Sequence, residues 1–336
     1  ASGAAGGGTI RVGGGLQGRD ASVPNARAVF IGPAAELRAD ATGARGDGGR
    51  IVVWSDEATR AYGRFSARGG RLGGDGGFVE TSGGWLDARP AAMDLSAPHG
   101  RPGNWLLDPH DILITSDATA ADRTITVAPG PIFTSNAGSS ILTTATLAAA
   151  LNQGTSVRVI TGGGGFQDGH IEMRGATLAV APPQPVTLSL EAAADIVISG
   201  STVSSSASPL SLTLTAAASG QGAIEIVDST ITTRGGNVRL GGAIATQLTL
   251  PDGTLTPTAR SVAVAWPGEV EGPAPVASNG ELLAIDIRRS TLDLGAGTFT
   301  AAGYSPMDGG AGIRIGGSPF DQVATSITAG TIDLFG

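Results

Sequence analysis

The chain has 336 residues, a formal net charge of −8, 54 Gly, 4% aromatic residues and no Cys. The acidic balance disfavours nucleic acid and anionic lipid as partners, and the lack of Cys excludes disulfides and thiolate metal sites. No stretch is apolar enough for a membrane-spanning helix, and no signal peptide is predicted. A thick aromatic core is excluded, whereas a thin core of layered Val, Ile and Leu side chains fits this composition.

The first third of the chain carries an internal echo. Residues 46–55 (GDGGRIVVWS) resemble residues 74–82 (GDGGFVETS) at a shift of 28 positions, and residues 102–107 form a degenerate third copy. A period in the twenties, with brief extended segments between Gly-rich corners, is too short for a propeller blade of ~40 residues and indicates one coil of a solenoid. We expect Gly at the corners because the backbone must turn there with positive φ.

Short apolar-polar-apolar strands continue along the chain, so we predict an all-β fold, a right-handed parallel β-helix. Thr143 to Gly154 interrupts the pattern, with Leu147 and Leu151 four residues apart, and reads as a short capped helix. The predicted organisation is a single elongated β-helix over 1–336, with regular coils in 1–110, looser coils in 111–245 including a short helix at 143–153, a Pro-rich loop or hairpin excursion at 246–282, and terminal coils in 283–336.

Four phrases in the first third carry a family resemblance. They are GRIVVWSD (49–56), SARGG (66–70), GDGGFVETSG (74–83) and WLLDPHDI (105–112). Together they resemble large exoproteins of the filamentous haemagglutinin family, which bacteria secrete by the two-partner route. The resemblance is close over roughly residues 7 to 175.

This resemblance implies a β-helical passenger that crosses the outer membrane unfolded through a dedicated transporter and acts at the bacterial cell surface or in the extracellular matrix. The implied partners are surface glycans or proteins of host or neighbouring cells, copies of the chain itself, and that transporter during export. The family's secretion domain with its Asn-Pro-Asn signatures is missing from the sequence, so we expect a downstream portion of a longer protein.

One tripeptide is a candidate receptor motif. Arg45, Gly46 and Asp47 spell the sequence that many adhesion receptors recognise, and they fall at a predicted exposed corner. Gly74-Asp75 occupies the same corner one repeat later, so the Gly-Asp pair is also explained by the turn alone.

Two further motifs have simpler explanations, and we expect no cofactor or metal. GGGLQG at 13–18 matches a dinucleotide fingerprint formally, but no helix is predicted after it to hold a pyrophosphate. GGDGG at 73–77 resembles a calcium-binding repeat, yet stacked copies with enough oxygen ligands are lacking.

An enzymatic alternative rests on Asp108, His110 and Asp111, because β-helices can host carboxylate groups that cleave acidic polysaccharides. Pro109 and the alternation of strand faces indicate instead a turn in which Asp108 accepts backbone donors. We therefore expect a non-catalytic extracellular structural or adhesive protein, with a polysaccharide-degrading lyase or hydrolase as the alternative.

Both ends of the predicted ladder present strands that another strand can extend. Stacking through them would join copies end to end into a fibre, a contact that need not close. The candidate assembly edges are Thr9, Ile10, Arg11 and Val12 at one end, and Thr331, Ile332, Asp333, Leu334 and Phe335 at the other.

Overall fold

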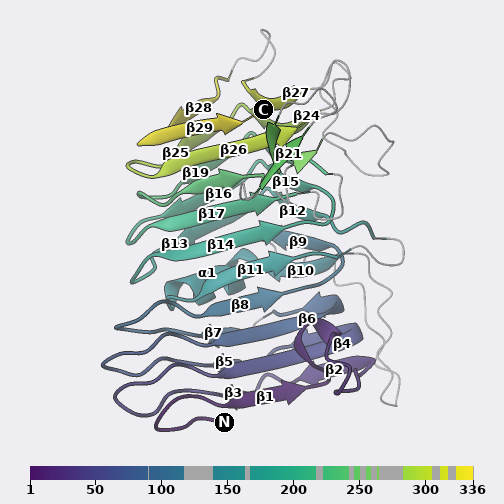
Figure 1. The fold of residues 1–336 in the computed structure, drawn as a ribbon, viewed down its shortest axis with the longest axis vertical. Helices are drawn as coiled ribbons and strands as arrows, with labels where there is room; N and C mark the ends of the chain where they lie inside the picture. The colour runs from purple at the N-terminus through teal and green to yellow at the C-terminus, as the bar shows by residue number, and fades with distance from the viewer. Residues whose placement is uncertain are drawn as a thin grey trace.

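The fold is seen in a computed structural model, which describes residues 1–89, 91–116, 139–162, 167–216, 222–241, 246–249, 255–258, 263–264, 283–304, 311–316 and 323–335. The chain winds into a stack of coils whose strands lie one above another along the long axis (Figure 1). Among the described pairings between coils all are parallel, which confirms the predicted parallel β-helix.

The strands fall into one large sheet and three smaller ones. The large sheet contains β1 (Thr9–Val12), β2 (Ala28–Ile31), β4 (Arg50–Ala61), β6 (Phe78–Asp87), β8 (Asn104–Leu107), β9 (Ile112–Thr115), β10 (Ser140–Thr143), β11 (Ser156–Ile160), β12 (Ile171–Arg174), β14 (Val186–Glu191), β15 (Ile196–Ser199), β17 (Leu210–Thr215), β18 (Ile224–Val227), β20 (Val238–Leu240), β23 (Ala263–Val264), β24 (Leu283–Arg288), β26 (Thr298–Tyr304), β27 (Ala311–Ile315) and β29 (Thr331–Phe335). The smaller sheets contain β3 (Glu36–Arg38), β5 (Arg64–Ser66) and β7 (Ala92–Asp94); β13 (Thr177–Val180), β16 (Thr202–Ser205), β19 (Thr230–Thr232), β25 (Thr291–Asp293) and β28 (Ser326–Thr328); and β21 (Thr246–Thr249) with β22 (Leu255–Thr258).

The core is a set of inward-facing columns that run parallel to the axis. One column pairs a single apolar residue of each coil with its counterpart in the next, about 4.8 Å away. Its members are Ile10, Ile51, Val79, Trp105, Val157, Leu188, Leu212, Val238, Phe299 and Ile332. Each fully buried member contributes roughly 1.5–3 kcal/mol, so stability grows with each coil that is added to the stack.

Three long loops, residues 39–49, 67–77 and 95–103, stack on one another beside the core. Each is closed by a backbone hydrogen bond between its two ends, and the Gly-rich corners there form a narrow waist between the core and the loops. Gly46 and Gly74 have the positive φ that we predicted, at 138° and 116°. Gly48 and Gly76 are glycine for a different reason, because a Cβ at either position would lie 2.0 Å from the carbonyl oxygen of Ala67 or Leu95, respectively. A backbone carbonyl of the next coil approaches too closely there to admit a side chain, so a glycine is required directly after Asp47 and directly after Asp75.

The predicted short helix is present as α1 (Thr144–Asn152), with Thr143 as its N-cap. The Thr143 hydroxyl accepts a hydrogen bond from the Thr146 backbone N–H, which satisfies one of the unpaired donors of the first turn. Leu147 and Leu151 are fully buried. The helix packs against β7 and β13, so it separates the two smaller parallel sheets on this side of the stack.

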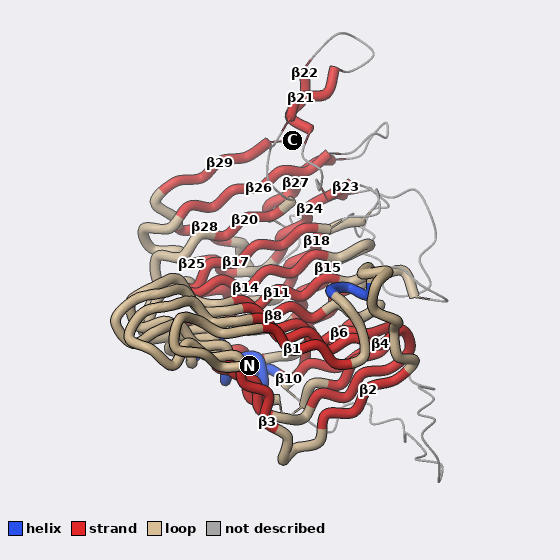
Figure 2. Tube along the Cα trace, turned by 60° about the horizontal axis from the view of Figure 1, so that its bottom comes forward, coloured by secondary structure: helices blue, strands red, loops and turns tan. Residues whose placement is uncertain are grey.

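The Pro-rich segment 246–282 is described only in part. β21 and β22 pair in antiparallel register, which confirms a hairpin excursion, and the hairpin projects beyond the stacked coils (Figure 2). β23 pairs in parallel with β26. The remainder of this predicted excursion lies outside the described residues.

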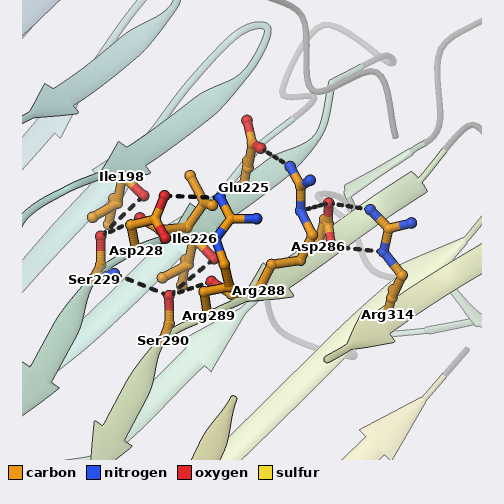
Figure 3. A network of polar contacts seen from close by, with 11 residues as sticks. Ile198, Glu225, Ile226, Asp228, Ser229, Asp286, Arg288, Arg289, Ser290 and Arg314 are labelled. Atoms are coloured by element: carbon orange, nitrogen blue, oxygen red, sulfur yellow. Dashed lines mark hydrogen bonds and ion pairs between the residues drawn. The ribbon is translucent and has the colours of Figure 1, made fainter. Parts of the chain in front are cut away.

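Buried charges link three adjacent coils on the outer side of β18, β24 and β27 (Figure 3). Asp286, whose side chain is 2% exposed, forms ion pairs with Arg288 at 2.8 Å and with Arg314 at 2.6 Å. Arg288 also pairs with Glu225. Beside these ion pairs, two serine hydroxyl groups repeat one arrangement on adjacent coils. The Ser229 hydroxyl donates to the backbone carbonyl oxygens of Ile198 and Val227, and the Ser290 hydroxyl donates to those of Ile226 and Arg288.

We expect Asp286→Asn to lower the free energy of unfolding by about 3 kcal/mol, because it neutralises the buried anion that the half-buried guanidinium groups of Arg288 and Arg314 both contact. The control is Asp228→Asn, which weakens the more exposed pair with Arg289 and should cost at most about 1 kcal/mol. Denaturant titrations of both variants measure the difference. Equal losses would contradict a buried network.

Gly76→Ala should destabilise the fold by about 1–3 kcal/mol or more, because the new methyl group meets the Leu95 carbonyl at a distance that requires a backbone shift. Gly162→Ala is the matched control, since a Cβ there has no atom within 4 Å. Thermal unfolding followed by circular dichroism compares the two. An unchanged unfolding temperature in Gly76→Ala would show that the waist is not tightly packed.

Candidate functional site

A short segment between β1 and β2 folds back over the outer side of the large sheet. We call residues 13–27 the strap; it includes the 3-10 turn η1 (Leu16–Gly18). Gln17, at the centre of this turn, has a left-handed φ of 51°. Trp54 and Asn25 fix the strap in place. A Cβ at Gly18 would lie 2.4 Å from Trp54 Nε1, and the Asn25 amide donates to Gly18 O and to Asp56 Oδ1.

Gln17 joins two carboxyl groups from consecutive coils. Its backbone N–H donates to both Oε1 and Oε2 of Glu80 at 3.1 Å, and its side-chain Nε2 donates to Asp108 Oδ2 at 3.0 Å. Glu80 comes from β6, and Asp108 directly follows β8, which pairs with β6. The strap therefore covers and bonds a pair of acids that the ladder brings together.

Burial dominates the electrostatics of these acids. Glu80 has no exposed surface, and the loss of hydration raises its pKa to about 7 against the opposing Gln17 hydrogen bonds. The pKa of Asp108 is also raised by burial, while Gln17, Arg19, His110 and Arg158 oppose the rise. Both groups thus hold a proton at a higher pH than an ordinary carboxyl, which is a property of groups that transfer protons.

Asp108 and Asp111, two of the three residues weighed for the enzymatic alternative, have different partners. Asp111 Oδ1 accepts hydrogen bonds from the backbone N–H groups of Gly169 at 2.8 Å and His170 at 2.7 Å, so it anchors the neighbouring coil. Asp108 instead faces Glu80 and Gln17. The backbone of His110 is bonded to the preceding coil, where its N–H donates to Gly84 O.

Sequence reasoning missed Glu80 and Gln17. Register places Glu80 on the outward column between Val52 and Leu106, which are 1% and 4% exposed. Two apolar residues beside an acid on an outward face signal that another segment covers them. Recognising this requires knowing the register, because the echo alone does not say which side of the strand faces the core.

A histidine–carboxylate contact links the next two coils, which contain β12 and β15. His170 Nδ1 lies 3.4 Å from Asp195 Oδ2, and Asp195 Oδ1 accepts a hydrogen bond from the Ala223 N–H. The hydrogen bond with Asp195 raises the pKa of His170, with burial opposing it and with added attraction from Asp195, Asp111 and Asp168. This contact joins adjacent coils and is part of the structural framework.

The candidate receptor motif lies on the stack of long loops, with Arg45 and Asp47 exposed and Gly46 half-buried. Asp47 is already engaged, because its Oδ1 accepts the backbone N–H of Asp75 at 2.7 Å. Asp75 repeats the role one coil later by accepting from Arg101. The Asp residues of this corner therefore link coils, which accounts for the Gly-Asp repeat.

The candidate assembly edges are the outer strands of the described ladder. β1 pairs with β4 and β29 with β26, and within the described part no further strand pairs with their other sides. Ile332, Leu334 and Phe335 are 48%, 50% and 42% exposed. An open recess of about 400 Å³ beside them is lined by Gly312, Ile313, Ile315 and Leu334.

No protein-family model matches this chain, and no curated protein is significantly similar to it. Among the described residues, no helix is long and apolar enough to cross a membrane. The same residues contain no group of three or more His, Asp or Glu side chains arranged to hold a metal ion. The site must therefore be interpreted from its own geometry.

The pKa of Glu80 predicts how stability depends on pH. The folded state holds a proton up to about pH 7, whereas the unfolded chain loses it near pH 4.3, so stability falls as pH rises between these values. Glu80→Gln, which mimics the neutral acid, should remove this fall and be about 2–3 kcal/mol more stable than the native chain at about pH 8. Urea unfolding at several pH values measures it.

Glu36→Gln is the control, because Glu36 is an exposed acid on β3. It should keep the pH dependence of the native chain. An unchanged pH dependence in Glu80→Gln would show that Glu80 is ionised at neutral pH in the folded state.

Proposed function

We propose that this chain is a section of a non-catalytic extracellular rod, of the filamentous haemagglutinin type, that serves in adhesion or matrix building at a bacterial surface. The observation that carries the proposal is the continuous parallel ladder. One inward column passes from Ile10 to Ile332, so the described coils share one core and form a stiff body with long flanks. Such a body can extend away from a cell surface and make many weak contacts along its length, and it is less suited to binding a ligand in a single deep site.

Secretion in an unfolded state fits the same features. Each coil contacts mainly the coils beside it, so a chain that emerges from a transporter can fold by adding one coil at a time to a finished end. The absence of Cys means that no disulfide has to form outside the cell. We propose an outer-membrane transporter as the partner during export and cell-surface glycans or proteins as partners afterwards.

End-to-end association is the second part of the proposal. The outer edge of β29 carries backbone groups and half-exposed apolar side chains that a further parallel strand would cover. That strand can come from a following coil or from another copy of the chain. Surface glycans would thus bind along the flanks of the rod, and further copies of the chain would bind at its edge strands.

One observation favours the enzymatic alternative. Glu80 and Asp108 are neighbouring acids with raised pKa values, as general acids of polysaccharide-cleaving enzymes are. The strap opposes this interpretation, because Gln17 bonds both acids and Val52 and Leu106 beside them are buried. A polysaccharide would have to displace the strap to reach them.

Labelling of intact producing cells tests the surface location. Antibodies against the purified chain should label cells without permeabilisation, and their Fab fragments should reduce attachment or aggregation of those cells. Labelling only after permeabilisation would overturn the proposal. Release of unsaturated or reducing ends from acidic polysaccharides, lost in Asp108→Asn, would establish the enzyme instead.

Sedimentation of the purified chain at increasing concentration tests association through the edge. We expect Leu334→Arg to weaken self-association by at least about tenfold, because it places a charge in the strand edge. Val323→Arg, at a position 57% exposed and outside β29, is the control and should associate like the native chain. Monomers at every concentration would remove self-assembly from the proposal.

A further inference from the structure

The turn after β8 holds a peptide bond with unusual chemistry. Asp108 is followed by Pro109, and this is the only Asp-Pro pair in the 336-residue sequence. The proline amide is tertiary, so its nitrogen lacks N–H and its resonance is easier to disrupt than that of an ordinary peptide. The Asp side chain can reach its own carbonyl carbon through a five-membered ring, the arrangement in which intramolecular attack is fastest.

The fold holds this bond on several sides. The scissile carbonyl oxygen of Asp108 accepts a hydrogen bond from the Gly83 N–H at 3.3 Å, and the Pro109 oxygen accepts one from the Gly162 N–H at 3.2 Å. Gln17 Nε2 holds Asp108 Oδ2 at 3.0 Å. The carbonyl is therefore polarised by an N–H donor from the preceding coil, and the hydrogen bond from Gln17 restrains the attacking carboxyl group.

From this geometry we infer that the Asp108–Pro109 peptide bond is a self-cleavage site, at which the Asp108 side chain cuts its own backbone without a protease. The inference is independent of the proposed function, since it concerns a covalent change within the coil stack. It adds an activity and a modification site to a chain whose core otherwise serves structure alone.

The reaction balances with one water molecule. A side-chain oxygen of Asp108 bonds to the Asp108 carbonyl carbon, while the carboxyl proton passes to the Pro109 nitrogen and the C–N bond breaks. The products are a cyclic anhydride on Asp108 and a secondary amine on Pro109. Water then adds to the anhydride and opens it to two carboxyl groups, so the net change is hydrolysis of one peptide bond without oxidation or reduction.

The charged surroundings set the pH dependence. Glu80 from β6, Arg19 from the strap, His110 from the turn and Arg158 from β11 face the Asp108 carboxyl. Burial outweighs the cations and raises the pKa of Asp108, so its proton persists to a higher pH than in an unfolded chain. Cleavage needs that proton and should therefore accelerate as the pH falls.

The ladder predicts that a nicked molecule stays in one piece. β8, on the first fragment, pairs with β6 of its own fragment and with β11 of the second. Size-exclusion chromatography should thus give the elution volume of the intact chain, whereas a denaturing gel should show two fragments. The second fragment should begin with the sequence Pro-His-Asp-Ile.

Intact-mass spectrometry of the folded full chain, incubated at about pH 5 and about pH 8, tests the inference. We expect fragments 1–108 and 109–336, formed faster at the lower pH and at least about tenfold faster than in urea-unfolded chain at the same pH. No fragments, or equal rates in folded and unfolded chain, would overturn it.

Three variants identify the reacting groups. Asp108→Asn removes the acid, and Pro109→Ala keeps the acid but restores an ordinary amide; each should slow cleavage by at least about 100-fold. Asp111→Asn is the matched control from the same turn and should cleave like the native chain. Circular dichroism confirms folding. If Asp108→Asn does not fold, Pro109→Ala decides the matter, and cleavage that persists at the native rate in Pro109→Ala refutes the mechanism.

Discussion

Hydrogen bonding between coils along the axis is the interaction on which the rest of this structure depends. Strands of only two to twelve residues pair with their counterparts one coil away, so each short strand is stable only within the stack. The same register repeats the side-chain positions, which converts an apolar-polar-apolar pattern into continuous inward and outward columns. Core columns, aspartate corners and buried ion pairs all follow from it.

The axial register also gives polar groups their partners. Asp47 and Asp75 accept from the next coil, as do Asp40 with Arg68 and Asp111 with His170. A carboxylate that links two coils in this way satisfies backbone donors that the irregular corners would otherwise leave unpaired. Many of the acids that make the chain anionic are thus structural, and an acidic residue at a corner is weak evidence for a ligand.

The strap is the exception to this repetition. It places Gln17 against Glu80 and Asp108 and covers an outward-facing column that would otherwise be exposed to solvent. The resulting burial raises the pKa values of both acids. Local chemistry in a solenoid therefore depends on segments that leave the repeat. The Asp108–Pro109 bond belongs to such a place, because donors from two other coils and the strap converge on a turn.

The sequence by itself determined the architecture. Period, glycine spacing and strand alternation were sufficient for the parallel β-helix, and Thr143 with Leu147 and Leu151 was sufficient for the helix, because backbone pairing and capping are local or strictly periodic. It also located the Asp108 turn. Tertiary structure alone decided which groups meet there, because Gln17 and Asp108 are 91 residues apart and only the coil register and the strap bring them together. It likewise showed that Gly48 and Gly76 are required by close backbone approach, which no spacing rule distinguishes from a turn with positive φ.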